Sequence, residues 1–122
     1  MYHKKRENVW SLFYCIVLDT AENTDVLKKD EENCLILIKE SLTEWGCIDI
    51  GSYVEERAVV IKMDAPPTLE IPAFINAFKT RLGRLYKSGK RGIFNQGYFA
   101  ATMRSCSDRP EVDYFKMKEE KQ

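Results

Sequence analysis

Apolar residues follow two different spacings along the chain, and the shorter spacing predicts four strands. Segment 9–18 is nearly continuous in apolar and β-branched residues, which is typical of a strand covered on both faces. Apolar and polar residues alternate over 48–55, which predicts a second strand, and 57–63 predicts a third strand that ends before Pro66-Pro67. We expect the second and third strands to form a hairpin. Segment 97–103 predicts the fourth strand.

Helical spacing of apolar residues predicts two helices between these strands. Thr24 or Asp25 is a candidate N-cap of the first helix, and Gly46 ends it. Its apolar face comprises Leu27, Cys34, Ile38, Leu42 and Trp45. The second helix opens at Thr68 and tolerates Pro72 in its first turn. Its apolar stripe comprises Ile71, Phe74, Ile75, Phe78, Leu82 and Leu85.

A last helix is predicted over 110–118, with Glu111 near its positive end. The predicted order of elements is therefore β-α-β-β-α-β-α. This order predicts an α+β fold, a ferredoxin-like sandwich (β-α-β-β-α-β) with an additional C-terminal helix. A chain of 122 residues is long enough for one core, so we expect a single domain, 1–122, that begins with a basic arm at 1–7.

Charge is balanced overall but unevenly distributed. Lys and Arg total 19, as do Asp and Glu, so the net charge predicts no partner. Acidic residues dominate 19–57, whereas 79–91 contains basic residues and no acidic one. A cationic helix without acids favours contact with phosphates, and the alternative is a solvated charged face. The predicted nucleic-acid-binding residues are Lys79, Arg81, Arg84, Lys87, Lys90 and Arg91, together with Tyr86.

Tyr86 is predicted to act differently from the six cations. Its ring would stack on an unpaired base, and the alternative is a residue at the rim of the core. The four cysteines are scattered without a CxxC pair, which is typical of reduced core thiols in a cytoplasmic protein. The sequence predicts no cofactor and no zinc site. It also contains no apolar run of membrane-spanning length and no signal-peptide pattern, so no membrane partner is expected.

Several short motifs, taken in order, carry a resemblance to a known family. They are the strand before Pro66-Pro67, Phe78-Lys79-Thr80-Arg81, Phe94-Asn95-Gln96-Gly97-Tyr98-Phe99 and Val112-Asp113-Tyr114-Phe115. With these motifs the chain resembles the small single-tyrosine transposases of the HUH superfamily, including the REP-associated type. The resemblance implies binding of imperfect DNA hairpins by a homodimer that joins the fourth strands, here 97–103.

The chain departs from this family at the catalytic positions. The family binds its metal with His-x-His on the strand before the prolines, where this chain has Ala58 and Val60. Because residues two apart on a strand share a face, Lys62 should lie on the same face. Tyr114 stands at the family's nucleophile position, and Lys118 replaces the ligand, typically Gln, one turn later. The resemblance thus implies that the metal site is lost and that Tyr114 is vestigial, an ordinary packing or surface tyrosine.

These observations predict a catalytically inactive, transposase-derived nucleic-acid-binding protein, not an enzyme. Hairpin or single-stranded DNA is the expected partner, with RNA as the alternative, and the expected role is regulatory or accessory to recombination. A protein-interaction module without nucleic-acid binding is a second hypothesis. A third is a metal-dependent tyrosine nickase whose metal site is rebuilt from Glu55, Glu56 or Asp64.

Overall fold

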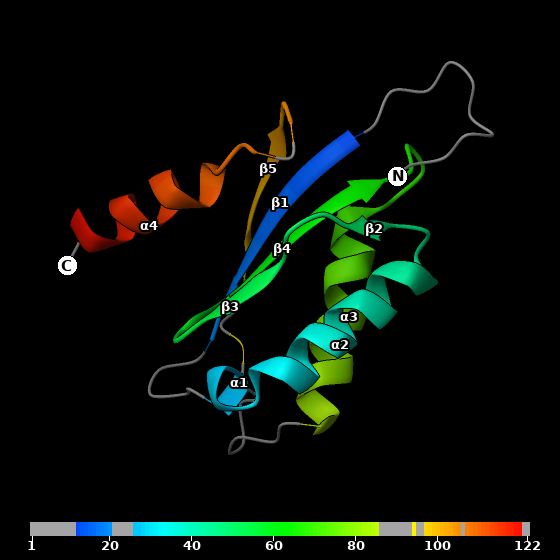
Figure 1. Cartoon of the computed structure of the whole chain (residues 1–122), viewed down its shortest axis with the longest axis horizontal. Helices are drawn as coiled ribbons and strands as arrows, with labels where there is room; N and C mark the ends of the chain where they lie inside the picture. The colour runs from blue at the N-terminus through cyan, green and yellow to red at the C-terminus, as the bar shows by residue number, and fades with distance from the viewer. Residues whose placement is uncertain (1–11, 21–25, 86–93, 95–96, 106, 121–122) are drawn as a thin grey trace.

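The computed structural model describes residues 12–20, 26–85, 94, 97–105 and 107–120. Five strands and four helices are assigned within these residues (Figure 1). In chain order they are β1 (Leu12–Asp19), α1 (Val26–Lys29), α2 (Glu31–Glu44), β2 (Ile48–Asp49), β3 (Tyr53–Glu55), β4 (Ala58–Ala65), α3 (Ile71–Leu85), β5 (Phe99–Met103) and α4 (Pro110–Glu120). No helix among them is long and apolar enough to cross a membrane.

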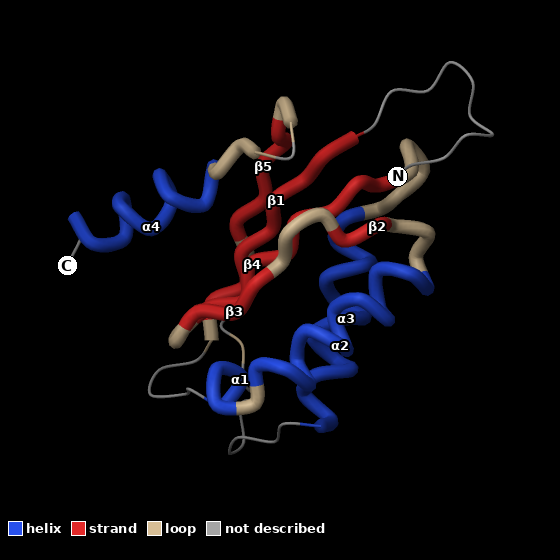
Figure 2. Tube along the Cα trace, in the orientation of Figure 1, coloured by secondary structure: helices blue, strands red, loops and turns tan. Residues whose placement is uncertain are grey.

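All strand pairs of the sheet are antiparallel. β1 lies in the centre between β4 and β5, and β2 and β3 both pair with β4 (Figure 2). The spatial order β5-β1-β4-β2/β3 is that of a ferredoxin-like sheet, and α4 is the additional C-terminal helix. The predicted fold class is therefore confirmed, including the hairpin between the second and third predicted strands.

Helices α2 and α3 lie together on one face of the sheet and enclose the larger core with it (Figure 1). The sheet contributes the inward residues of β1 and β4, and the helices contribute the apolar faces that the sequence predicts. The largest fully buried side chains of this core are Ile16, Leu18, Leu27, Ile38, Leu42, Ile61, Met63, Phe74, Ile75, Phe78 and Leu82. Leu85 is an exception to the predicted stripe, because it is the last residue of α3 and its side chain is exposed.

The predicted end of the first long helix is confirmed in detail. Gly46 has a positive φ of 75°, which a residue without a Cβ adopts without strain. The Cys47 amide donates to the Leu42 carbonyl at 2.8 Å, and the Gly46 amide donates to the Thr43 carbonyl at 3.1 Å. These two bonds form a Schellman motif that satisfies the last carbonyls of α2.

Two predicted elements are interrupted in the structure. The helix predicted from Thr24 or Asp25 is divided into α1 and α2 at Asp30, and the two candidate caps lie outside the described residues. The second predicted strand is divided into β2 and β3, because the Asp49 carboxylate accepts the amides of Gly51 and Ser52 and bends the chain there. The first strand extends to Asp19, one residue beyond its predicted end.

Candidate functional site

The second face of the sheet carries α4, and β4 presents Ala58 and Val60 to it. These two residues are buried in a small apolar cluster separate from the core that contains Val59 and Ile61. The buried members of the cluster are Cys15, Val17, Ala58, Val60 and Met103. The predicted placement of Ala58 and Val60 on the face opposite Val59 and Ile61 is confirmed. Neither side chain has an atom that can bind a metal.

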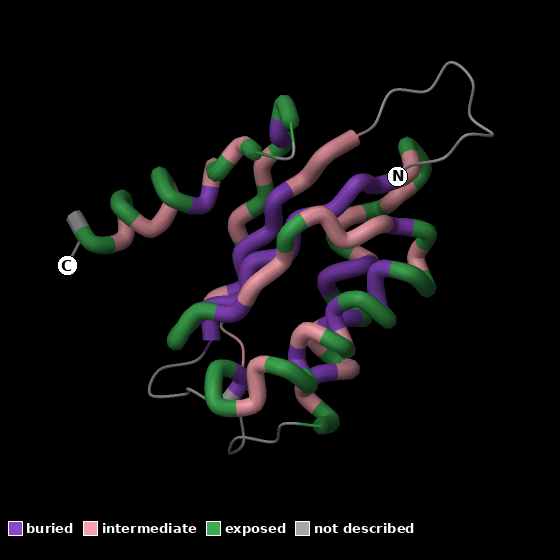
Figure 3. The backbone as a smooth tube through the Cα atoms, in the orientation of Figure 1, coloured by how far each residue is buried: buried purple, intermediate pink, exposed green. Residues whose placement is uncertain are grey.

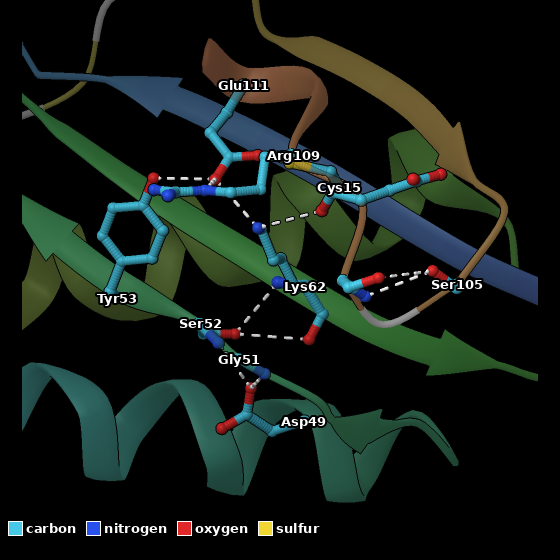
Figure 4. A network of polar contacts seen from close by, with 11 residues as sticks. Cys15, Asp49, Gly51, Ser52, Tyr53, Lys62, Ser105, Arg109 and Glu111 are labelled. Atoms are coloured by element: carbon cyan, nitrogen blue, oxygen red, sulfur yellow. Dashed lines mark hydrogen bonds and ion pairs between the residues drawn. The ribbon is translucent and has the colours of Figure 1, made fainter.

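Lys62 extends the same face of β4 and forms an ion pair with Glu111 in the first turn of α4. Its Nζ lies 2.8 Å from Glu111 Oε2, and the two side chains are 7% and 0% exposed. The Tyr53 hydroxyl donates to the same oxygen at 2.9 Å, and Lys62 Nζ donates to the Asp108 carbonyl at 3.3 Å. Figure 4 shows Lys62, Tyr53 and Glu111 pointing toward one another.

Burial and charge act in opposite directions on Glu111. Burial alone would raise the pKa of this carboxyl, but the hydrogen bonds from Lys62 and Tyr53 outweigh it and lower the pKa. Burial and the bond to Glu111 raise the pKa of Tyr53 to about 12. Burial, reinforced by the charge of Glu111, raises the pKa of the Cys15 thiol to about 12. Glu111 is therefore ionised at neutral pH, whereas Tyr53 and Cys15 are protonated.

Tyr114 lies one helical turn after Glu111, and its hydroxyl donates a hydrogen bond to Asp19 at the end of β1. Lys118 Nζ lies 2.8 Å from the other carboxylate oxygen of Asp19 and 5.6 Å from the centre of the Tyr114 ring. The ring stacks on Phe99, with the two centres 4.6 Å apart. Burial, and next the bond to Asp19, raise the pKa of Tyr114 to about 12, so the phenol is protonated at neutral pH.

Asp19 is the cross-strand partner of Ala58, so Tyr114 lies beside the position where the family resemblance places a histidine. A cleft of about 720 Å³ opens here between α4 and the turn that joins β3 to β4. Its charged lining residues are of both signs: Lys28, Arg57, Arg109, Lys116 and Lys118, with Asp19, Glu55, Glu56 and Glu119.

The structure does not bring together the three carboxylates of the rebuilt-site hypothesis. Glu55 pairs with Ala58 at one end of β4, whereas Asp64 pairs with Ile48 at the other end, six residues or roughly 20 Å along the strand. Asp64 is buried, and its Oδ1 has no hydrogen-bond partner among the residues that the structure describes. Within the described part of the chain, no group of three His, Cys, Asp or Glu side chains is arranged to hold a metal ion.

The predicted nucleic-acid-binding residues fall partly on α3. Lys79 Nζ donates to the Gly97 carbonyl at 3.0 Å, and partial burial lowers its pKa. Arg81 crosses to α2, where its guanidinium lies 2.9 Å from Glu40 and 3.2 Å from Glu44. Arg84 is exposed. The remaining predicted residues, Tyr86, Lys87, Lys90 and Arg91, lie outside the described residues. Phosphate contact by this set stays a prediction.

Sequence reasoning missed two carboxylates that organise the α4 face. Glu111 was assigned only to the positive end of its helix, and Asp19 lies just beyond the predicted first strand. A signal for the first was present, because Lys62 follows four consecutive apolar residues in its strand and a lysine buried there requires an anionic partner. No comparable signal marks Asp19, whose partners lie 95 and 99 positions further along the chain.

Comparison with known proteins rests on structure. No protein-family model matches the chain, and no curated protein matches its sequence. A crystal structure from Deinococcus radiodurans R1, described as a "putative transposase", aligns with a TM-score of 0.77 over 98% of this chain and 97% of that chain, at 19% identity. A REP-associated tyrosine transposase bound to a REP hairpin aligns with a TM-score of 0.63 over 94% of this chain and 68% of that chain, at 8% identity. The chain therefore shares the fold of these proteins.

Proposed function

We propose that this chain is a catalytically inactive, transposase-derived protein that binds nucleic acid. The observation that carries the proposal is the composition of the face beneath α4. At the two positions where the family resemblance expects histidines, this face has buried Ala58 and Val60. The adjacent position holds the ammonium group of Lys62, which is paired with Glu111.

The chemistry of DNA cleavage by tyrosine explains why this composition argues against catalysis. A bound metal would polarise the phosphate and stabilise the leaving oxygen. Tyr114 has a pKa raised to about 12, mainly by burial, so its phenol is a poor nucleophile at neutral pH. Its hydroxyl proton is directed to Asp19, whose second oxygen is paired with Lys118.

Support for nucleic-acid binding comes from the fold and from the charges on α3. One structural neighbour is bound to a REP hairpin, and the present chain aligns with it over 94% of its length. We therefore infer that hairpin or single-stranded DNA is the partner, with RNA as the alternative. Arg84 is the exposed cation of the described predicted set and lies beside a shallow groove of about 530 Å³ with Asn76 and Thr80.

We also infer a homodimer that joins two copies of β5. Within the described residues β5 pairs with β1 alone and is therefore an edge strand. Its sequence, Phe99 to Met103, contains neither Lys nor Pro, the residues that commonly protect an exposed edge. Twofold pairing of two such edges satisfies both and closes the assembly. Light scattering at micromolar concentration should give about twice the chain mass of 14.2 kDa.

The decisive experiment separates binding from cleavage. Labelled single-stranded, hairpin and duplex DNA, and an RNA hairpin, are titrated with the protein at two salt concentrations. The same DNA hairpin is incubated with protein and Mg²⁺ or Mn²⁺ and examined for a covalent adduct. We expect salt-dependent binding of the hairpin and no adduct. An adduct that is lost in Tyr114→Phe would overturn the inactive assignment.

A protein-interaction module remains the second candidate function, and one contact favours it. Arg81 is paired with Glu40 and Glu44, so one of the predicted phosphate ligands is already matched with carboxylates. Absence of binding to every nucleic acid at low salt would favour this candidate and contradict the first.

A further inference from the structure

The way in which α4 is attached to the sheet differs from that of α2 and α3. Two of its apolar side chains, Val112 and Met117, are 37% and 54% exposed. Tyr114 and Phe115 contact the small apolar cluster but are only partly buried. Figure 3 shows α4 as mostly exposed or intermediate, whereas β4 is buried along its length. Apolar burial therefore contributes less to holding this helix than it does to holding α2 and α3.

The helix face that meets the sheet also carries polar groups. Glu111, Tyr114 and Lys118 are spaced by three and four residues, so they lie on one side of α4. Two clamps result. The inner clamp joins Glu111 to Lys62 and Tyr53, with Arg109 Nε 3.6 Å away and the Cys15 sulfur 3.7 Å away. The outer clamp joins both Tyr114 and Lys118 to Asp19.

From these contacts we propose that α4 is a separately releasable helix, fastened to its own sheet by the inner and outer clamps. A buried ion pair loses much of its Coulombic gain to desolvation, so it sets the position of a helix more than it adds to global stability. An element held in this way opens locally at lower free energy than an element buried in the main core.

Release of α4 would expose the face of the sheet that the helix covers. The buried cluster that includes Cys15, Val17 and Val60 would become accessible. Tyr114 would leave Asp19 and Phe99 at the same time, because it makes both contacts from one side of the helix. The two clamps therefore determine both the coverage of this face and the position of the tyrosine. This inference does not depend on whether the protein binds nucleic acid.

Amide hydrogen exchange measured by mass spectrometry on the full chain tests the proposal. Glu111→Gln breaks the inner clamp and Asp19→Asn weakens the outer clamp. Asp113→Asn is the matched control, because Asp113 is the exposed carboxylate of the same first turn of α4 and does not line the cleft. We expect peptides of α4 to exchange on the order of 100-fold faster in Glu111→Gln and about tenfold faster in Asp19→Asn. Peptides of β1 and α3 should keep their protection, and Asp113→Asn should stay close to the parent chain.

Two results would overturn the proposal. Unchanged exchange of α4 in both clamp variants would mean that Tyr114 and Phe115 hold the helix by apolar contact. A rise of equal size in α4, β1 and α3 would mean that the clamps stabilise the whole fold. Asp19→Asn keeps the test valid if Glu111→Gln does not fold, because the Asp19 carboxylate is partly exposed and its replacement leaves the inner clamp intact.

Discussion

The two faces of the sheet are built on different physical principles. The face under α2 and α3 buries large apolar side chains, with Phe74 and Phe78 stacked at 6.0 Å between ring centres. The face under α4 buries small apolar residues and one ion pair, Lys62–Glu111. Apolar burial is non-directional and contributes most of the stability, whereas a buried ion pair requires one geometry. The first face therefore stabilises the fold, and the second fixes the position of one helix.

The largest expected effect lies on the α2 and α3 face. Phe78→Ala removes a fully buried ring and should lower the free energy of unfolding by about 3–5 kcal/mol. Phe115→Ala, the matched change on the α4 face, removes a partly buried ring and should cost only about 1–2 kcal/mol. Urea denaturation of both variants measures the difference. Equal losses of unfolding free energy in the two variants would show that apolar burial stabilises both faces to the same extent.

Acid should act selectively on the α4 face. The folded-state pKa of Glu111 is lowered, so its contribution to stability is present above the unfolded pKa of about 4.3 and is lost as the pH falls below that value. The groups that face it are Lys62, Arg109, Tyr53 and Cys15. We expect α4 to lose its protection from amide exchange as the pH falls below about 4.3, and to do so at a higher pH than α3. Simultaneous loss in both helices would contradict the separation of the two faces.

The same contrast explains what could be predicted from the sequence. The faces of α2 and α3 were predictable because apolar burial leaves a periodic pattern, as at Phe74, Phe78 and Leu82. The position of α4 was not, because it depends on pairs such as Lys62–Glu111 that join distant segments and leave no local period. The alternation of residues along the strand predicted that Ala58 and Val60 share one face. It did not predict that Glu111 and Asp19 contribute carboxylates to that face.

A smaller effect is expected at alkaline pH. The pKa of Tyr114 is raised to about 12, so its hydrogen bond stabilises the fold fully below the unfolded pKa of about 10 and is lost as the pH rises toward 12. Among the tyrosines that the structure describes, Tyr53 and Tyr114 should titrate late in an ultraviolet titration of the parent chain. Tyr114→Phe should remove one of them and cost about 1 kcal/mol. Titration of Tyr114 near pH 10 would mean that its bond to Asp19 is not maintained in solution.

The smallest effect is expected where an ion pair lies at the surface. Arg81 connects α3 to α2 through Glu40 and Glu44, and its side chain is 31% exposed against 54% and 64% for the two carboxylates. Exposed pairs contribute little, so Arg81→Gln should lower the free energy of unfolding by about 0.2–1 kcal/mol. Glu111→Gln should cost more than this, because it leaves the ammonium group of Lys62 buried without its anion.

Hairpin binding gives Arg81 a second test. Because its guanidinium is held by two carboxylates, Arg81→Gln should change the salt dependence of hairpin binding less than Arg84→Gln does. Each lost phosphate contact removes roughly 0.7–0.9 from the slope of log affinity against log salt concentration. We expect this change for Arg84→Gln and a smaller one for Arg81→Gln. A full change of slope for Arg81→Gln would show that the Arg81 guanidinium leaves Glu40 and Glu44 and contacts a phosphate when the hairpin binds.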